Sequence, residues 1–140
     1  MSETRPSAVT AAFWLLVLGA VLLMAGGLLA GLVSFDALRE TAPSTVTDDA
    51  VRAYARLYRG TGILFGLAGV ALVWFAGRAR RRDLRSRRAA MALALTVVVV
   101  VAVAAVLSGT HILALLSLIP IVVGALLLSR PGVVEWYAGE

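Results

Sequence analysis

The residues with the greatest capacity for chemistry are seven arginines crowded into positions 78–88, which read R-A-R-R-R-D-L-R-S-R-R. Asp83 is the one acid among them, so the segment carries +6 in a chain of 140 residues whose total is +5. Guanidinium groups bind phosphates through paired N–H donors, and basic clusters beside a membrane span attract anionic lipid. The segment is therefore a candidate contact for lipid headgroups or a partner protein, the alternative being a determinant of topology alone. The candidates are Arg78, Arg80, Arg81, Arg82, Arg85, Arg87 and Arg88.

Few other residues offer chemistry. The chain has no cysteine and one histidine, His111, which falls in a predicted turn. A histidine near carboxylates can bind a divalent ion or respond to pH, but no spacing here imposes ligand geometry. Without a general base paired to a nucleophile, we expect no catalytic residue, no metal site, no cofactor and no enzyme.

The elements that must position the arginines are too apolar for water. Hydrophobic residues make up 61 % of the chain and the mean hydropathy is +0.94, which lies outside the range of soluble domains. The expected fold is an all-α membrane protein, a bundle of four transmembrane helices built as two helical hairpins within a single domain. The basic balance therefore indicates membrane lipids as the anionic neighbour, and no nucleic acid.

Charge-free runs set the expected spans. Residues 11–33 are continuously apolar, which is long for a cleavable signal peptide, and residues 60–77 carry no charge. Residues 89–129 form a charge-free run of 41, twice the length of one span, so they must fold back at the turn formers of 108–111. This predicts spans at 89–107 and 112–129. Five valines at 97–101 favour a strand in water, but an open strand cannot satisfy its backbone in lipid.

Polar segments connect these spans. Residues 34–59 have no net charge and are expected to be an outer loop in which Thr47, followed by two acids, starts a helix that continues into the span 60–77. Residues 78–88 form the expected cytoplasmic loop. Residues 130–140 form the tail, where Pro131 and Gly132 stop the last helix and Trp136 and Tyr137 lie on the membrane surface.

Orientation follows from the arginines, because basic loops stay in the cytoplasm. Both termini are then cytoplasmic, and the expected interface anchors fall on that same side. All thirteen basic residues are arginine, a bias typical of GC-rich coding that indicates a bacterial inner membrane. The anchors are Trp14, Trp74, Trp136 and Tyr137.

Small residues four apart indicate close helix packing, because lipid supplies no hydrophobic drive for helices to associate. Most such pairs are expected to pack inside one copy of the chain, and some to contact a partner. Pro120, within the span 112–129, is expected to kink its helix rather than mark a transport site. The pairs are Gly27 with Gly31, Gly62 with Gly66, and Ala105 with Gly109.

The layout resembles that of uncharacterised small four-span membrane proteins of high-GC bacteria. The resemblance rests on an early Phe13-Trp14 pair, a glycine-rich second span, the arginine-only inner segment and a closing R-P-x-x-x-x-W-Y at 130–137. It covers the whole chain and implies no activity and no functional residue.

Three functions stay open at this point. No charged residue lies in a predicted span, whereas ion-coupled transporters rely on them, and this favours a non-catalytic accessory or scaffold subunit of a larger inner-membrane complex. Its partner would be another membrane protein, or the chain itself. A small self-associating transporter or channel is the alternative. A lipid-modifying enzyme, with His111 and the acids of 34–59 forming an outer site, is the third.

Overall fold

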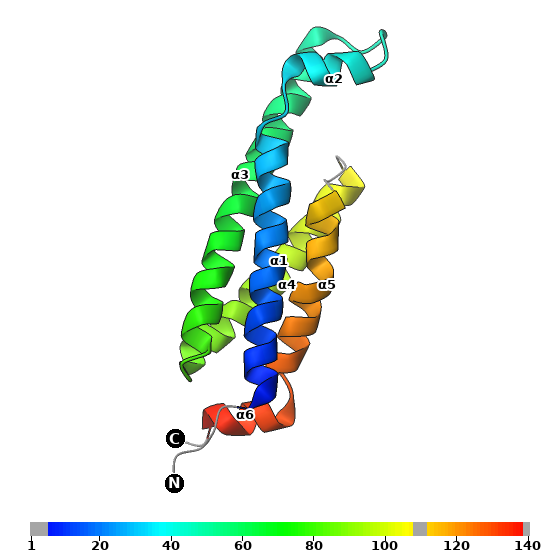
Figure 1. Cartoon of the computed structure of the whole chain (residues 1–140). Coiled ribbons are helices and arrows are strands. Elements are labelled where there is room, and N and C mark those ends of the chain that lie inside the picture. Colours follow the sequence, from blue (N-terminus) through cyan, green and yellow to red (C-terminus); the bar gives the residue numbers. More distant parts are fainter. Residues whose placement is uncertain (1–5, 108–111, 139–140) are drawn as a thin grey trace.

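The computed structural model describes residues 6–107 and 112–138, and within these ranges the chain forms helices joined by short turns, with no strand (Figure 1). His111 and Gly109, singled out above, lie outside the described residues. The helices are α1 (Ser7–Gly31), α2 (Phe35–Thr41), α3 (Asp48–Ala79), α4 (Leu84–Leu107), α5 (Ile112–Leu128) and α6 (Pro131–Ala138).

The first helix is the centre of the assembly. Its most extensive contacts are with α3 and α5, while α4 packs against α3 and α5 (Figure 1). The short helix α2 packs on α3, at what we term the α2 end. The opposite end, termed the arginine end, comprises the last turn of α3, residues 80–83, the first turns of α4, and α6, which lies across it (Figure 1).

Three of the described helices, α1, α3 and α4, are long and apolar enough to cross a membrane. Helix α5 has 17 residues, and α6 leaves it at a bend of 58°, so the two together make a fourth candidate. The chain is thus all-helical, with several helices suited to a multi-pass membrane protein.

Helix α3 extends well beyond a membrane span. Its 32 residues measure about 48 Å, against a hydrocarbon core of about 30 Å. The Thr47 hydroxyl accepts the N–H of Ala50 at 3.2 Å and so caps the helix, which then runs unbroken through 60–77 to Ala79. The first twelve residues of α3 and helix α2 therefore stand outside the apolar part of the bundle.

The connections are shorter than the charge pattern indicated. The expected loop 78–88 is wrong in extent, since only residues 80–83 lie outside a helix. Arginine is a good helix former, so Arg78 completes α3 while Arg85, Arg87 and Arg88 join α4. The segment 34–59 also contains α2, which Ser34 caps through the N–H of Ala37 at 3.1 Å.

The tail likewise differs from the expectation. Helix α5 ends at Leu128, just before Pro131 and Gly132, but Pro131 then begins a further helix, α6, that was not expected. Proline suits the first helical position, because the N–H it lacks would have no partner there and its φ is already helical. The 58° bend between α5 and α6 turns the chain across the end of the bundle.

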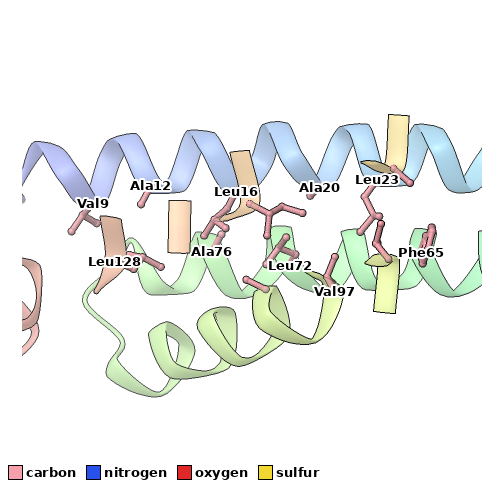
Figure 2. Packing of buried hydrophobic residues seen from close by; sticks show 14 of the residues in the cluster. Val9, Ala12, Leu16, Ala20, Leu23, Phe65, Leu72, Ala76, Val97 and Leu128 are labelled. Atoms are coloured by element: carbon pink, nitrogen blue, oxygen red, sulfur yellow. The ribbon is translucent and has the colours of Figure 1, made fainter. Parts of the chain in front are cut away.

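The core is apolar and surrounds α1. Leu16 and Leu23 of α1, Leu72 of α3 and Ile121 of α5 are 0–1 % exposed. Figure 2 shows the α1 side chains opposite those of α3 and α4. The residues labelled there are Val9, Ala12, Leu16, Ala20, Leu23, Phe65, Leu72, Ala76, Val97 and Leu128.

Glycines bring α1 and α3 into backbone contact. A Cβ on Gly27 would lie 2.5 Å from the carbonyl oxygen of Gly62 and 3.1 Å from the backbone nitrogen of Gly66, and one on Gly62 would lie 3.0 Å from that of Gly31. These two predicted pairs therefore face each other within the chain. Ala105 is half-exposed and outside the core cluster.

A second glycine contact, between α1 and α5, was not predicted. A Cβ on Gly26 would lie 3.0 Å from the backbone nitrogen of Ala114, and one on Gly124 would lie 3.2 Å from the carbonyl oxygen of Ala12. Gly19 meets α5 in the same way, with Ser117 O at 3.1 Å. Gly19 and Gly26 are seven residues apart, which places them two turns apart on one face of α1. The buried Pro120 lies within α5, which continues on both sides of it.

Candidate functional site

Polar contacts at the arginine end join helices that are far apart in the sequence, and they divide the seven arginines into two groups. Three are partly buried and turn toward the bundle, and we term these the inward arginines, Arg80, Arg82 and Arg87. Four are exposed, and we term these the outward arginines, Arg78, Arg81, Arg85 and Arg88.

Arg87 binds the carbonyl at the end of α5. Its Nε and Nη2 donate to Leu128 O at 3.1 and 2.8 Å. A continuous helix would satisfy that carbonyl with the N–H four residues on, but the chain bends there. A guanidinium at a helix C-terminus also meets the negative end of the helix dipole. Arg87 thus ties α4 to α5.

Arg82 makes the equivalent tie to α6. Its Nε donates to Trp136 O at 2.8 Å, and its guanidinium carbon lies 5.2 Å from the centre of the Trp136 ring. Arg82 has a φ of 69°, in the left-handed region that arginine rarely adopts. The tight turn between α3 and α4 imposes this conformation, and the contacts with α6 help to hold it.

Tyr137 of α6 makes a third contact at the arginine end, and it holds α6 against the end of the bundle. Its hydroxyl donates to Ala79 O, the carbonyl of the last residue of α3, and its ring stands 5.4 Å from the guanidinium of Arg87. The side chain is only 2 % exposed. The expectation that Tyr137 lies on the membrane surface is therefore wrong, because α6 turns this residue into the bundle.

Arg80 lies against α1, with its guanidinium carbon 4.8 Å from the centre of the Phe13 ring. Its Nε is buried, as is the indole nitrogen of Trp136, and neither has a hydrogen-bond partner in the described residues. The aromatic face offsets part of the cost of burying the charge.

Asp83 caps α4. Its Oδ1 accepts the N–H groups of Arg85 and Ser86 at 3.1 and 3.3 Å, and its Oδ2 accepts the Ser86 hydroxyl at 2.8 Å. The hydroxyl and N–H of Ser86 hold the pKa of Asp83 below its ordinary value of 3.8; desolvation opposes them, and the N–H of Arg85 and the charge of Arg78 lower the pKa further. Asp83 is therefore a structural acid committed to the start of α4.

Two of the outward arginines, Arg78 and Arg81, border a pocket of about 510 Å³. Val73, Trp74 and Gly77 of α3 form its apolar side, and Arg78, Arg81 and Asp83 its polar side. Arg78 lies 5.8 Å from the Trp74 ring centre, and its Nε is 3.6 Å from Asp83 Oδ2. Arg81 is exposed and has no side-chain partner in the described residues.

The predicted anchors occupy different surroundings. Trp14 and Trp74 are 58 % and 62 % exposed and point away from the bundle. Trp136 is half-buried under Arg82 and stacks edge-on against Tyr137. Trp14 and Trp74 thus face outward, whereas Trp136 and Tyr137 pack within the arginine end.

Arginines also hold backbone at the α2 end, which the sequence analysis did not predict. Arg39 donates to Val46 O at 2.6 Å and to Pro43 O at 2.7 Å, and it pairs with Asp48 at 3.2 Å. Arg59 donates to Val33 O through Nε and Nη2, at 3.0 and 2.8 Å. These residues fix the loop between α2 and α3 and the end of α1.

A second pocket, of about 530 Å³, is an apolar groove between α4 and α5. Met91, Leu95 and Val98 line it on α4, with Val122 and Leu126 on α5. Residues 6–107 and 112–138 hold no group of three or more His, Asp or Glu side chains placed to bind a metal ion.

Comparison with known protein families, with characterised proteins and with solved structures finds no match to this chain. Its chemistry must be argued from the site. Guanidinium groups beside an indole ring at the end of an apolar helix are suited to binding an anion that carries an apolar group.

Proposed function

We propose that this chain is a non-catalytic subunit, an accessory or scaffold protein, of a larger complex in a bacterial inner membrane. It crosses the membrane four times, with α5 and α6 together completing the fourth crossing, and the arginine end faces the cytoplasm with both termini. The partner is another membrane protein.

The observation that carries this proposal is the filled interior. The buried hydroxyl groups in the described residues belong to Ser86, Ser117 and Tyr137, and each has a partner: Ser86 bonds to Asp83, Ser117 to Ala114 O at 2.5 Å, and Tyr137 to Ala79 O. No charged side chain is fully buried in those residues. A transporter or channel acting alone needs a polar path or an ionisable group at membrane depth, so a dry bundle favours a structural role.

Charge distribution supports the orientation. The described residues of the arginine end include Arg130 and Glu135 besides the cluster, and they sum to +6, from eight arginines and two acids. Residues 34–59 at the α2 end sum to zero, from four arginines and four acids. Placing the basic end inside agrees with the positive-inside rule.

Two surfaces are available to a partner. The groove between α4 and α5 is apolar and open to the side, which suits a neighbouring helix within the membrane. The α2 end projects from the apolar part of the bundle and is held in one shape by Arg39 and Arg59. Both surfaces fit binding better than catalysis.

Mild-detergent purification of the native protein, followed by mass spectrometry of the retained proteins, tests the proposal. We expect a second membrane protein at a fixed ratio. Leu95→Trp, which fills the groove, should reduce its retention, whereas Leu67→Trp on the exposed face of α3 should not. A monomer purified without any partner would contradict the proposal, and substrate flux in liposomes holding this chain alone would favour the transporter alternative.

Cysteine labelling tests the topology directly, because the natural chain has none. A cysteine at position 84, the first residue of α4, should react in inverted vesicles and stay protected in intact cells. A cysteine at position 40 in α2 should show the reverse. Labelling of position 84 from outside would overturn the orientation.

A further inference from the structure

The pocket beside Trp74 lies where an apolar helix meets the basic turn. Val73, Trp74 and Gly77 belong to the last two turns of α3, and Arg78 and Arg81 follow immediately. Any ligand that fills it therefore contacts apolar atoms on one side and guanidinium groups on the other. A phospholipid has the same arrangement, with apolar acyl chains on one side of its glycerol and a phosphate headgroup on the other.

The two arginines of this pocket are not committed to holding the fold. Arg81 has no side-chain partner in the described residues, and the Arg78 side chain is 56 % exposed. The inward arginines, in contrast, bind helix carbonyls or cover an aromatic ring. Arg81 can thus bind a phosphate without losing a side-chain contact, and Arg78 gives up at most its exposed pair with Asp83 at 3.6 Å.

Asp83 is the acid that could repel an anion here. Both of its carboxylate oxygens accept hydrogen bonds from the first turn of α4, and Arg78 lies beside it. Its charge is therefore directed at the start of α4, where the helix dipole also favours it. With two arginines and one acid, the lining keeps a net charge of +1.

Space for the ligand comes from Gly77. A Cβ at this position would meet no atom within 4 Å, so the helix surface is open between the Trp74 ring and the arginines. Trp74 is 62 % exposed, so its ring is accessible to the glycerol and the first acyl carbons.

We propose that this pocket binds the headgroup of an anionic phospholipid, with Arg78 and Arg81 on the phosphate and Trp74 against the glycerol region. The inference rests on the membrane placement proposed above, and it assigns the lipid to two of the four outward arginines. Arg85 and Arg88, in the first turns of α4, lie outside the pocket lining.

Native mass spectrometry of the full-length protein, titrated with phosphatidylglycerol or phosphatidylcholine of identical acyl chains, tests the site. We expect one phosphatidylglycerol to be retained in preference to phosphatidylcholine. Arg78→Gln with Arg81→Gln should lower this preference about 30-fold, from about 1 kcal/mol for each charge. Arg85→Gln with Arg88→Gln removes the same charge from the same end and should change it less than about threefold.

A third variant separates shape from charge. Gly77→Leu fills the pocket while keeping every arginine, and its side chain enters open space, so the helix should still form. We expect it to lose the bound lipid as fully as the arginine variant. Circular dichroism of each variant confirms its helix content before the titration.

Each other outcome overturns the inference. Equal losses in the two double variants would mean that the arginine end attracts anionic lipid only as a diffuse charge. Displacement of the lipid by millimolar inorganic phosphate would mean that the ligand is a free anion. The experiment contains no second protein, so a missing partner complex leaves its result unaffected, and an inverted topology is detected separately by the labelling at position 84.

Discussion

Gly27 of α1 and Gly62 of α3 are in backbone contact, and each leaves no room for a Cβ on the other. A Cβ on Gly27 would lie 2.5 Å from Gly62 O, and one on Gly62 would meet Gly27 O. Both obstacles are backbone atoms, which cannot move aside without separating the helices. In lipid, such close approach replaces the hydrophobic drive that joins helices in water.

Gly62→Ala should therefore destabilise the bundle by about 1 to 3 kcal/mol, the usual cost of overpacking. Gly66→Ala is the matched control, because it lies one turn further on α3 and its Cβ would meet nothing within 4 Å. That change should stay within about 0.5 kcal/mol. Unfolding in increasing SDS, followed by circular dichroism, measures both. Equal losses would contradict the backbone contact as their source, because Gly→Ala raises helix propensity and by itself stabilises a helix.

Tyr137→Phe removes the hydroxyl that donates to Ala79 O and keeps the buried ring. We expect a loss of about 1 to 3 kcal/mol, the cost of a buried acceptor that loses a donor. The N–H of Arg82 also binds this carbonyl at 3.1 Å, which favours the lower half of that range. The same SDS unfolding assay measures it. Tyr58→Phe, at the opposite end of α3, should have little effect.

Arg87→Gln should loosen α6, because Leu128 O would lose both of its guanidinium donors. Hydrogen bonds that involve a charged group contribute about 1.5 to 3 kcal/mol. Quenching of Trp136 fluorescence by iodide reports the loosening, in a Trp14→Phe, Trp74→Phe background. Arg88→Gln removes an exposed neighbour with the same charge and should leave quenching unchanged. Similar quenching in both variants would argue against a specific tie.

Acidification should fray the first turn of α4. The folded pKa of Asp83 lies below its ordinary 3.8, so the ionised carboxylate stabilises the fold. That contribution is fully present above the ordinary pKa and is lost as pH falls through the lower folded value. Hydrogen exchange at the N–H groups of Arg85 and Ser86 measures the change. Asp83→Asn keeps a capping side chain without titrating, so its exchange should not show the acid transition.

Sequence patterns predicted helix, apolar surface and the start of α3 at Thr47, because charge and capping residues act locally. The four-span count and the orientation stay predictions. The division of the arginines could not be predicted, since it depends on α6 lying across the bundle. Leu128 contacts Arg87, and Tyr137 contacts Ala79. No sequence pattern at either residue of a pair indicates its partner. The α1–α5 glycine contact does not follow from small residues four apart, because Gly19 and Gly26 are seven residues apart.

The hydrogen bonds at the arginine end can form only late in the synthesis of the chain. Arg87, Arg82 and Ala79 find their partners 41, 54 and 58 residues further along the chain. Residues 79–87 are synthesised before Leu128, Trp136 and Tyr137, and at about 5 to 20 residues per second the separation of 41 to 58 residues corresponds to several seconds. During that time Ala79 O lacks the hydroxyl of Tyr137 as a donor. The guanidinium groups of Arg82 and Arg87 likewise lack the carbonyls of Trp136 and Leu128 as acceptors. The contacts that hold the arginine end together are therefore completed only when α6, the last helix, has been synthesised.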